Sequence, residues 1–180
     1  MDILKIDEEL SLRQIELADA KEVFELTDHS RDYLKEWLPW LDTTLQVKDT
    51  KEFIKICVKG AEENKSLNTV ILFKGEIVGV AGFNSINKAN NTAYIGYWLG
   101  KDYQGNGIMT RVVKALTNYA FAELHLNKVE IWAAVENKKS RNIPERLHFV
   151  EEGCIRSAEW LYDHYIDSVV YGMLASEWNG

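Results

Sequence analysis

A strand, a glycine-containing loop, a long helix and a second strand follow one another in the middle of this chain. The strand Asn91–Leu99 is rich in aromatic and β-branched residues and is bounded by turn-forming residues. From about Gly107 to Leu124, apolar residues recur at helical spacing. The segment Lys128–Val135 then alternates apolar and polar side chains. This order restricts the fold more than any other feature, because it predicts a βαβ-like unit with its ligand at the carboxyl end of the first strand.

The other elements agree with an α/β fold, and the 180 residues contain no linker or repeat, so we expect one domain spanning residues 1–180. Their order predicts a mixed sheet with helices on both faces. Further strands are expected at Leu10–Glu16, Asn68–Phe73, Glu76–Phe83, Phe149–Ala158 and Ile166–Met173. Further helices are expected at Asp19–Asp28, Asp49–Glu63 and Lys139–His148. The second has Asp49 as a candidate N-cap and an apolar face of Phe53, Ile54 and Cys57, which Ala61 could extend.

The loop Gln104-Gly105-Asn106-Gly107 predicts an anion site that is made from main-chain groups. Two glycines allow a tight turn and a close approach of the ligand, and the amides at the start of the next helix attract phosphate. Two glycines alone are a weak signal, but their place between strand and helix strengthens it. A nucleotide-binding protein is a rival, although the loop lacks the Gly-Lys-Ser/Thr of a P-loop and the third glycine of the dinucleotide fingerprint.

Several spaced motifs resemble the GCN5-related N-acetyltransferases (GNAT). The segment Gln104–Gly107 is similar to their acyl-CoA pyrophosphate loop, Arg/Gln-x-x-Gly-x-Gly/Ala, although Met109 stands at its last position. Later segments resemble the branch that acetylates ribosomal-protein amino termini, in which a larger residue at that position is common: Asn137–Ser140, Glu145–Phe149, Glu152–Cys154 and Ala158–Leu161. Weaker similarity reaches back to Leu10, so the resemblance covers nearly the whole chain. It implies the GNAT fold, with a mixed, mostly antiparallel sheet of about six or seven strands.

The resemblance implies that acetyl-CoA is the co-substrate. By analogy, an amide at Trp98 or Leu99 polarises the thioester carbonyl where the strand splays open, and Asn137 contacts the pantetheine unless it is a turn residue. Gly96 in the same strand is compatible with a bulge or with close packing. The residues expected around the pyrophosphate are Gln104, Gly105, Asn106, Gly107, Ile108, Met109 and Thr110.

The general base is less plainly marked. Many relatives have Glu where this chain has Tyr94, and tyrosine is a poor base at neutral pH. Glu159 is the alternative, because Trp160 and Leu161 beside it could desolvate it and raise its basicity; otherwise it is a surface carboxylate. Ser140 resembles the serine that approaches the thioester sulfur, or it is a helix N-cap.

The aromatic segment around Tyr33, Trp37 and Trp40 is a candidate wall or lid of the acceptor cleft. Core packing of an irregular loop, or a dimer contact, explains the same residues. His148 replaces the glycine that the family usually shows before Phe149, which implies some strain if that position needs a positive φ.

Composition limits the class of protein. A net charge of −7 argues against general nucleic-acid binding. The basic residues around the proposed cofactor segments suit an anion locally: Lys101, Arg111, Lys114, Lys138, Lys139 and Arg141. There is no membrane-spanning run or signal peptide, and Cys57, Cys154 and the four histidines form no metal-binding pattern. We therefore expect no metal and a cytoplasmic protein whose two thiols are buried or half-buried.

The sequence leaves three functions open. The first is an acetyltransferase acting on a protein amino terminus, possibly ribosomal. The second acetylates a small amine such as a polyamine, amino sugar or antibiotic. The third is a non-catalytic acyl-CoA-binding module, which the absence of Glu at position 94 would favour. A homodimer agrees with the resemblance and with six tryptophans, which can equally be core residues.

Overall fold

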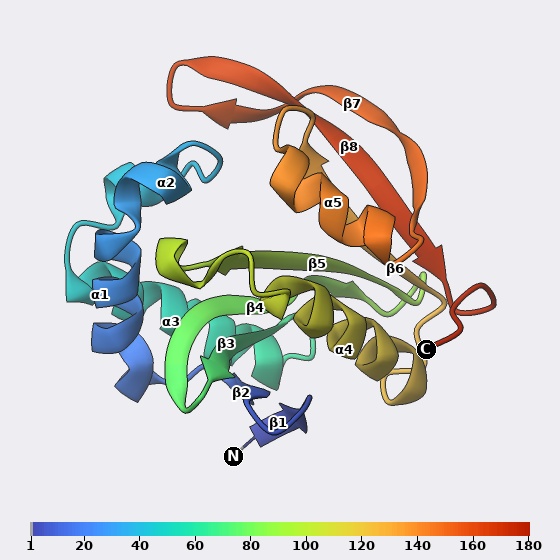
Figure 1. Cartoon of the computed structure of the whole chain (residues 1–180), viewed down its shortest axis with the longest axis horizontal. Coiled ribbons are helices and arrows are strands. Elements are labelled where there is room, and N and C mark those ends of the chain that lie inside the picture. Colours follow the sequence, from blue (N-terminus) through green and yellow to red (C-terminus); the bar gives the residue numbers. More distant parts are fainter. Residues whose placement is uncertain (1) are drawn as a thin grey trace.

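The computed structural model describes residues 2–180, and its strands belong to one sheet (Figure 1). The order across this sheet is β1-β2-β3-β4-β5-β6-β8-β7. The strands are β1 (Asp2–Lys5), β2 (Leu10–Gln14), β3 (Leu67–Phe73), β4 (Glu76–Asn87), β5 (Thr92–Leu99), β6 (Lys128–Ala134), β7 (Val150–Leu161) and β8 (His164–Leu174). The helices are α1 (Ala20–His29), α2 (Arg31–Lys35), α3 (Val47–Glu62), α4 (Ile108–Ala122) and α5 (Lys138–Arg146).

The sheet is mixed and mostly antiparallel, as predicted. Among the described strands, β5 and β6 form the one parallel pair, and α4 connects them as the predicted βαβ unit. All seven predicted strands are present, with ends shifted by a few residues. The eighth, β1, was not predicted, because four residues are too few for an alternating pattern to stand out.

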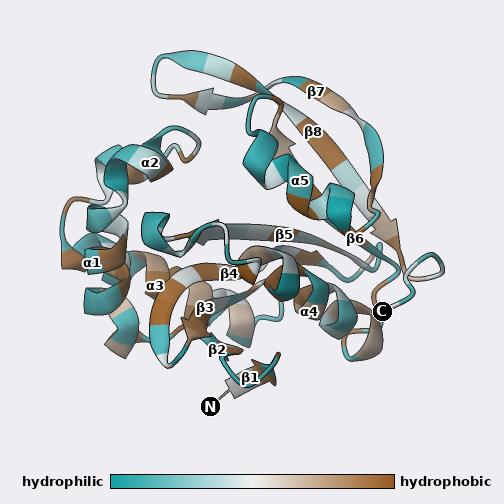
Figure 2. Ribbon diagram, viewed as in Figure 1, coloured by the Kyte–Doolittle hydropathy of each residue, from teal (hydrophilic) through white to brown (hydrophobic). Residues whose placement is uncertain are grey.

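Helices cover both faces of the sheet, and each face has its own apolar core (Figure 1). Neighbouring residues of β3 illustrate the division. Val70 is buried with Ile54 of α3, whereas Ile71 is buried in the core that contains Val112 of α4. Because side chains alternate along a strand, the apolar run of β3 supplies both cores, and Figure 2 shows hydrophobic residues along β3 and β4.

Three smaller predictions are wrong. Asp49 is not the N-cap of α3, because the helix begins at Val47; its Oδ2 accepts the Gln46 N–H at 3.0 Å from within the first turn. Phe53 is 43% exposed, although Ile54 and Cys57 of its predicted face are buried. Cys154 is exposed on β7, whereas Cys57 is buried as expected.

The feature of the fold that positions the site is the separation of β5 from β6. Residues Thr92–Ile95 lie beside Lys128–Ile131, and the two strands do not pair beyond Ile95. The second half of β5, residues 96–99, therefore has no strand partner on the β6 side. Main-chain polar groups need partners, so such a gap suits a ligand that can supply them. Within residues 2–180, no helix is long and apolar enough to cross a membrane.

Candidate active site

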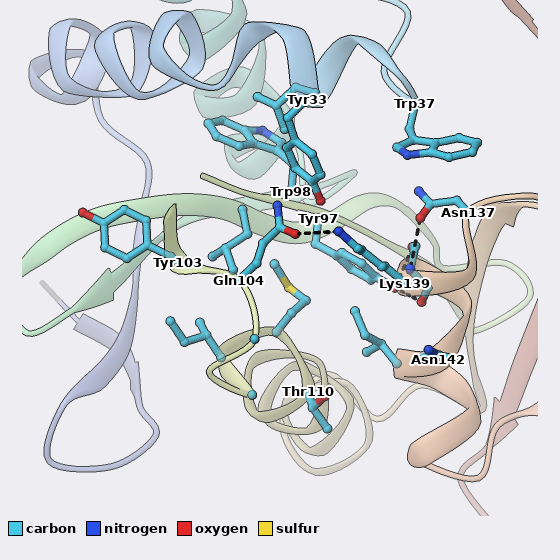
Figure 3. Close-up of a pocket in the computed structure, with 18 of the residues that line it drawn as sticks. Tyr33, Trp37, Tyr97, Trp98, Tyr103, Gln104, Thr110, Asn137, Lys139 and Asn142 are labelled. Atoms are coloured by element: carbon cyan, nitrogen blue, oxygen red, sulfur yellow. Dashed lines mark hydrogen bonds between the residues drawn. The ribbon is translucent and has the colours of Figure 1, made fainter. Parts of the chain in front are cut away.

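A cleft of about 480 Å³ lies where β5 and β6 separate, between α2, α5 and the loop before α4 (Figure 3). Its volume is within the range of small-molecule sites, roughly 300–1,000 Å³. The cleft is lined by Tyr33, Leu34, Trp37, Leu38, Tyr97, Trp98, Leu99, Tyr103, Gln104, Gly105, Gly107, Ile108, Met109, Thr110, Asn137, Lys139, Ser140, Asn142, Ile143 and Arg146. It thus brings together the predicted site residues except Asn106, Trp40 and Glu159.

The backbone of the loop before α4 requires its two glycines. Gly105 has φ 79° and Gly107 has φ 66°, a region that is costly for residues with a Cβ. Gly107 is the N-cap of α4, so the amides of Ile108–Thr110 have no partner within the helix. All three residues line the cleft, and the positive end of the α4 dipole therefore faces it.

Asn106 of this loop and Met109 of α4 also stabilise the fold around the cleft. The Asn106 side chain donates to the carbonyl oxygens of Tyr103 and Gln104, each at 3.3 Å, and so stabilises the turn. Met109, at the position that departs from the GNAT pattern, is only 7% exposed and belongs to the core beneath α4. A large side chain is tolerated there because the core accommodates it.

The amide of Leu99, rather than that of Trp98, is directed toward the gap. A Cβ added at Gly79 of β4 would lie 2.3 Å from the Trp98 carbonyl oxygen, so that carbonyl faces β4. The Gly100 N–H also faces β4 and donates to the Val78 carbonyl at 2.8 Å. Because main-chain groups alternate in direction along a strand, the intervening Leu99 faces the opposite way.

Gly96 makes room for a side chain from the neighbouring strand. Its own pairing with Gly82 is regular, and the irregularity lies in β4, where Asn84 is the extra residue of a bulge. A Cβ at Gly96 would lie 2.1 Å from the Asn84 Nδ2. The Asn84 amide therefore lies over β5, on the face that carries the Trp98 side chain. Nothing in the local sequence marks this bulge.

The start of α5 places Ser140 against Tyr97. Asn137 is the N-cap, and its Oδ1 accepts the Ser140 N–H at 3.1 Å (Figure 3). The capping role considered for Ser140 thus belongs to Asn137. The Ser140 hydroxyl instead donates to the Tyr97 Oη at 3.2 Å.

Pro144 explains a second bond between these residues. Proline has no N–H, so the carbonyl of Ser140, four residues earlier, cannot receive its usual helical hydrogen bond. The Tyr97 hydroxyl donates to this carbonyl at 3.1 Å. Burial raises the pKa of Tyr97 far above its ordinary value of 10.0, so the hydroxyl remains a neutral donor. Together the two bonds hold Ser140 at the point where the strands separate.

Glu159 is not part of the lining of the cleft. The register of β7 shifts between Ile155 and Glu159, and bulges of this kind redirect the side chains that follow them. Burial, and then the Glu159 charge, raises the pKa of the Tyr94 hydroxyl, so the two groups interact. Partial burial also raises the pKa of Glu159 above its ordinary value of 4.5, although the residue is exposed to solvent.

The aromatic residue near Glu159 is Tyr94 and not Trp160, which the sequence had suggested. Trp160 is 51% exposed and contacts Tyr165 with ring centroids 4.8 Å apart. Adjacent side chains of a strand point to opposite faces, so Trp160 faces away from Glu159. Tyr94, whose ring centroid lies 5.9 Å from that of Trp132, is the aromatic group near the carboxylate.

Comparison with known proteins identifies the family. Residues 9–150 match the family model of the acetyltransferase (GNAT) domain. This chain belongs to the GNAT family. YdaF of Bacillus subtilis (strain 168), a candidate ribosomal N-acetyltransferase, is 34% identical over 98% of this chain and 97% of its own length.

Two solved structures extend this likeness to the GNAT fold. RimL, a ribosomal L7/L12 alpha-N-protein acetyltransferase in complex with coenzyme A, has a TM-score of 0.92 at 27% identity and covers 95% of this chain and 97% of its own. The microcin C7 self-immunity acetyltransferase MccE, in complex with acetyl-CoA and AMP, has a TM-score of 0.90 at 30% identity and covers 94% of both chains. The protein is accordingly a GNAT-type N-acetyltransferase.

The aromatic segment forms one wall of this GNAT cleft. Tyr33 and Trp37 line it, and Trp40 contacts Trp98 with ring centroids 6.1 Å apart. The segment therefore does both: it packs on β5 through Trp40, and it lines the cleft through Tyr33 and Trp37. Lys139 spans the opening, with Nζ 3.3 Å from the Gln104 Oε1 and 5.7 Å from the Tyr33 ring centroid (Figure 3).

The basic residues near the GNAT loop divide into two groups. Arg111 is paired with Asp7 at 2.6 Å, and the Nε of Arg141 donates to the Tyr171 hydroxyl at 2.8 Å, so both stabilise the fold. Lys139 and Arg146 line the cleft instead. Sequence reasoning missed Arg146, although its position two helical turns after Lys139 places both on one face of α5.

His148 occupies the left-handed position that ends α5, with φ 60°. The N–H groups of His148 and Phe149 donate to the carbonyls of Glu145 and Pro144 at 3.1 and 2.9 Å. These two bonds form a Schellman motif, in which glycine usually takes the left-handed position. The turn is therefore the one the family pattern implies, in spite of the histidine.

Proposed function

We propose that this protein transfers the acetyl group of acetyl-CoA to the α-amino group of a protein, in particular a ribosomal protein. One observation carries the proposal. A single cleft runs from the unpaired amides of α4 to the gap between β5 and β6, with an aromatic wall along it and with Glu159 near Tyr94 of β5. The similarity to YdaF and RimL supports the choice of acceptor.

The groups that line the cleft suit acetyl-CoA. The amides of Gly105–Thr110 would hold the diphosphate without a lysine. The Leu99 N–H would polarise the thioester carbonyl, and the Asn137 Nδ2 would contact a pantetheine amide. The Ser140 hydroxyl would then lie near the sulfur.

In the reaction, the amine nitrogen bonds to the acetyl carbon and the carbon–sulfur bond breaks. The proton that the amine loses passes to Glu159, which acts as the general base. The Leu99 N–H stabilises the oxyanion, and the Ser140 hydroxyl turns from the Tyr97 Oη to donate its hydrogen bond to the departing thiolate. The thiolate takes up one proton and leaves as the free thiol, so no further reagent is consumed.

The modest basicity of a carboxylate favours an α-amino acceptor. The α-amino group has a pKa of about 7.7–8.0, against about 10.4 for a lysine-type amine. At neutral pH, roughly a tenth of α-amines are therefore neutral, but fewer than roughly one in a thousand alkyl amines are. An α-amine consequently reaches its nucleophilic form without a strong base.

Thiol release from acetyl-CoA, measured with a panel of amines, tests this acceptor. Peptides with a free amino terminus are expected to release coenzyme A faster than spermidine or an amino sugar. The same peptides with blocked termini are the matched control and should give only the background rate. Release with small amines alone would contradict the proposal.

A small-molecule acceptor is the second candidate, because the MccE complex holds AMP with acetyl-CoA. Tyr94 and Trp132, near Glu159, are aromatic groups on which a ring could stack. The panel therefore includes an amine-bearing nucleoside, and turnover confined to it would favour this candidate.

Arg146 is proposed to attract the phosphates of acetyl-CoA, because it lines the cleft beside the loop. Replacing it by Ala is expected to weaken acetyl-CoA binding about fivefold at low salt, the effect of one exposed charge pair of about 1 kcal/mol. The loss should shrink as salt screens the charge. Calorimetric titration at two ionic strengths measures this. Lys138→Ala, on the same helix but outside the cleft, is the control, and equal affinity of both variants would contradict the assignment.

A further inference from the structure

Two segments that lie far apart in the chain meet at one tyrosine. The Tyr162 hydroxyl donates to the Leu38 carbonyl at 2.5 Å and accepts the Leu41 N–H at 3.3 Å, across 121 residues of sequence. Tyr162 lies at the turn between β7 and β8, and Leu38 and Leu41 lie on either side of Trp40 in the aromatic segment. In Figure 1 the tip of the β7–β8 hairpin bends toward α2.

A cation reinforces this junction. The Lys35 ammonium lies 4.6 Å from the centre of the Tyr162 ring, in the geometry of a cation–π contact. The same ammonium is 2.6 Å from the Asp42 carboxylate. The turn is therefore held to Lys35 of α2 and to residues 38–42 that follow it.

The backbone at Tyr162 is one that an aromatic residue rarely adopts. Its φ is 60°, and the Asp163 N–H donates to the Leu161 carbonyl at 2.7 Å. A three-residue turn with a positive φ at its centre is uncommon and strained. Glycine or asparagine would fit this turn more easily, but neither could place a ring and a hydroxyl against the aromatic segment.

From these contacts we infer that Tyr162 is a positioning residue for acetyl transfer, and that it fixes the distance between the acceptor wall and Glu159. This inference rests on the proposed function, because it assigns that wall to the acceptor. Leu38, whose carbonyl Tyr162 holds, lines the cleft. Glu159 precedes Tyr162 by three residues on β7, after the bulge, so the same contact also holds the carboxylate in place.

The part of β7 that carries Glu159 bends at Ser157. Its φ is 48°, and its N–H donates to the Asp167 Oδ1 at 2.7 Å, inside the bulge of β7. The bulge interrupts pairing with β8 between Ile155 and Glu159. In the hairpin beyond it, Leu161 is buried whereas Trp160 and Tyr165 are exposed, and the Tyr162 hydroxyl supplies the hydrogen bonds to the opposite wall.

The test is Tyr162→Phe, which removes one oxygen atom and both hydrogen bonds. We expect kcat/KM for the acceptor to fall about tenfold, mostly through KM, as follows from losing about one net hydrogen bond. The dissociation constant of acetyl-CoA should stay within about twofold of the parent value, because Tyr162 does not line the cleft. Tyr165→Phe is the matched control, since it lies on the same hairpin and its hydroxyl has no hydrogen bond among the residues described.

Hydrogen exchange supplies a readout that does not depend on the acceptor. The Leu41 amide should exchange faster in Tyr162→Phe, while amides of the β3–β4 pair, as a reference for global stability, should not change. Unchanged exchange at Leu41 would overturn the inference, and so would faster exchange with an unchanged acceptor KM. Kinetics are measured with whichever amine of the panel is turned over, so failure of a protein amino terminus as acceptor would be recognised separately.

Discussion

Replacing Glu159 by Gln is expected to lower kcat about a hundredfold or more, the usual contribution of a positioned general base. The amide keeps the size and most of the hydrogen bonding of the carboxylate but cannot accept the proton of the attacking amine. Acetyl-CoA affinity should hardly change, because Glu159 lies outside the lining of the cleft. Steady-state thiol release and a separate titration with acetyl-CoA measure the two quantities.

The pH profile of this variant provides an internal check. Burial raises the pKa of Glu159 above 4.5, so in the parent enzyme kcat/KM should rise with pH as this raised pKa is passed and the base becomes deprotonated. In Glu159→Gln, this rise of kcat/KM should be absent. A second rise, at the higher pH where the acceptor amine loses its proton, should remain. Glu151→Gln, on the same strand, is the control. A variant at position 159 with parental kcat would remove the carboxylate from the mechanism.

Gly107→Val is expected to weaken acetyl-CoA binding about a hundredfold. At φ 66° a β-branched side chain is strained, so the loop must change its conformation. The amides of Ile108–Thr110 would then no longer point at the diphosphate. Loss of one or two charge-assisted hydrogen bonds, at about 1.5–3 kcal/mol each, corresponds to this change. Calorimetric titration with acetyl-CoA measures it directly.

Gly75→Val is the matched control for this variant. Gly75 also has a positive φ, 86°, and a Cβ added at either glycine would meet no atom within 4 Å. It lies in the β3–β4 turn, outside the cleft, so the same backbone strain should lower the melting temperature without changing acetyl-CoA affinity. Equal loss of affinity in both variants would show that strain alone, rather than the loop, is responsible.

The fold could be predicted from the sequence where patterns are long and regular. The aromatic and β-branched residues of β5, the alternation of β6 and the helical spacing of α4 predicted the βαβ unit, and the structure confirms it. Short or irregular features were missed, such as β1 and the bulge at Asn84. Such features have too few residues for a period to appear, and they depend on what the neighbouring strand does.

For the candidate site, the sequence indicated which residue types take part, but it did not indicate the direction in which their groups point. The two glycines before α4 predicted a tight turn, and both have a positive φ in the structure, a backbone that few other residues accept. No local signal indicated that the amide of Leu99, and not that of Trp98, faces the gap, because the register with β4 decides it. Likewise, Pro144 did not indicate that the Ser140 carbonyl, which it leaves without a helical hydrogen bond, would accept one from the Tyr97 hydroxyl.

By itself, the sequence determined the family, the anion loop and the order of the elements, because these depend on residue types at short and fixed spacings. The tertiary structure alone decided that Tyr162 joins the turn of the β7–β8 hairpin to the aromatic segment, and that Glu159 lies beside Tyr94. Such contacts join residues that are far apart in the chain. They exist only after strand register and the β7 bulge have set the direction of each side chain.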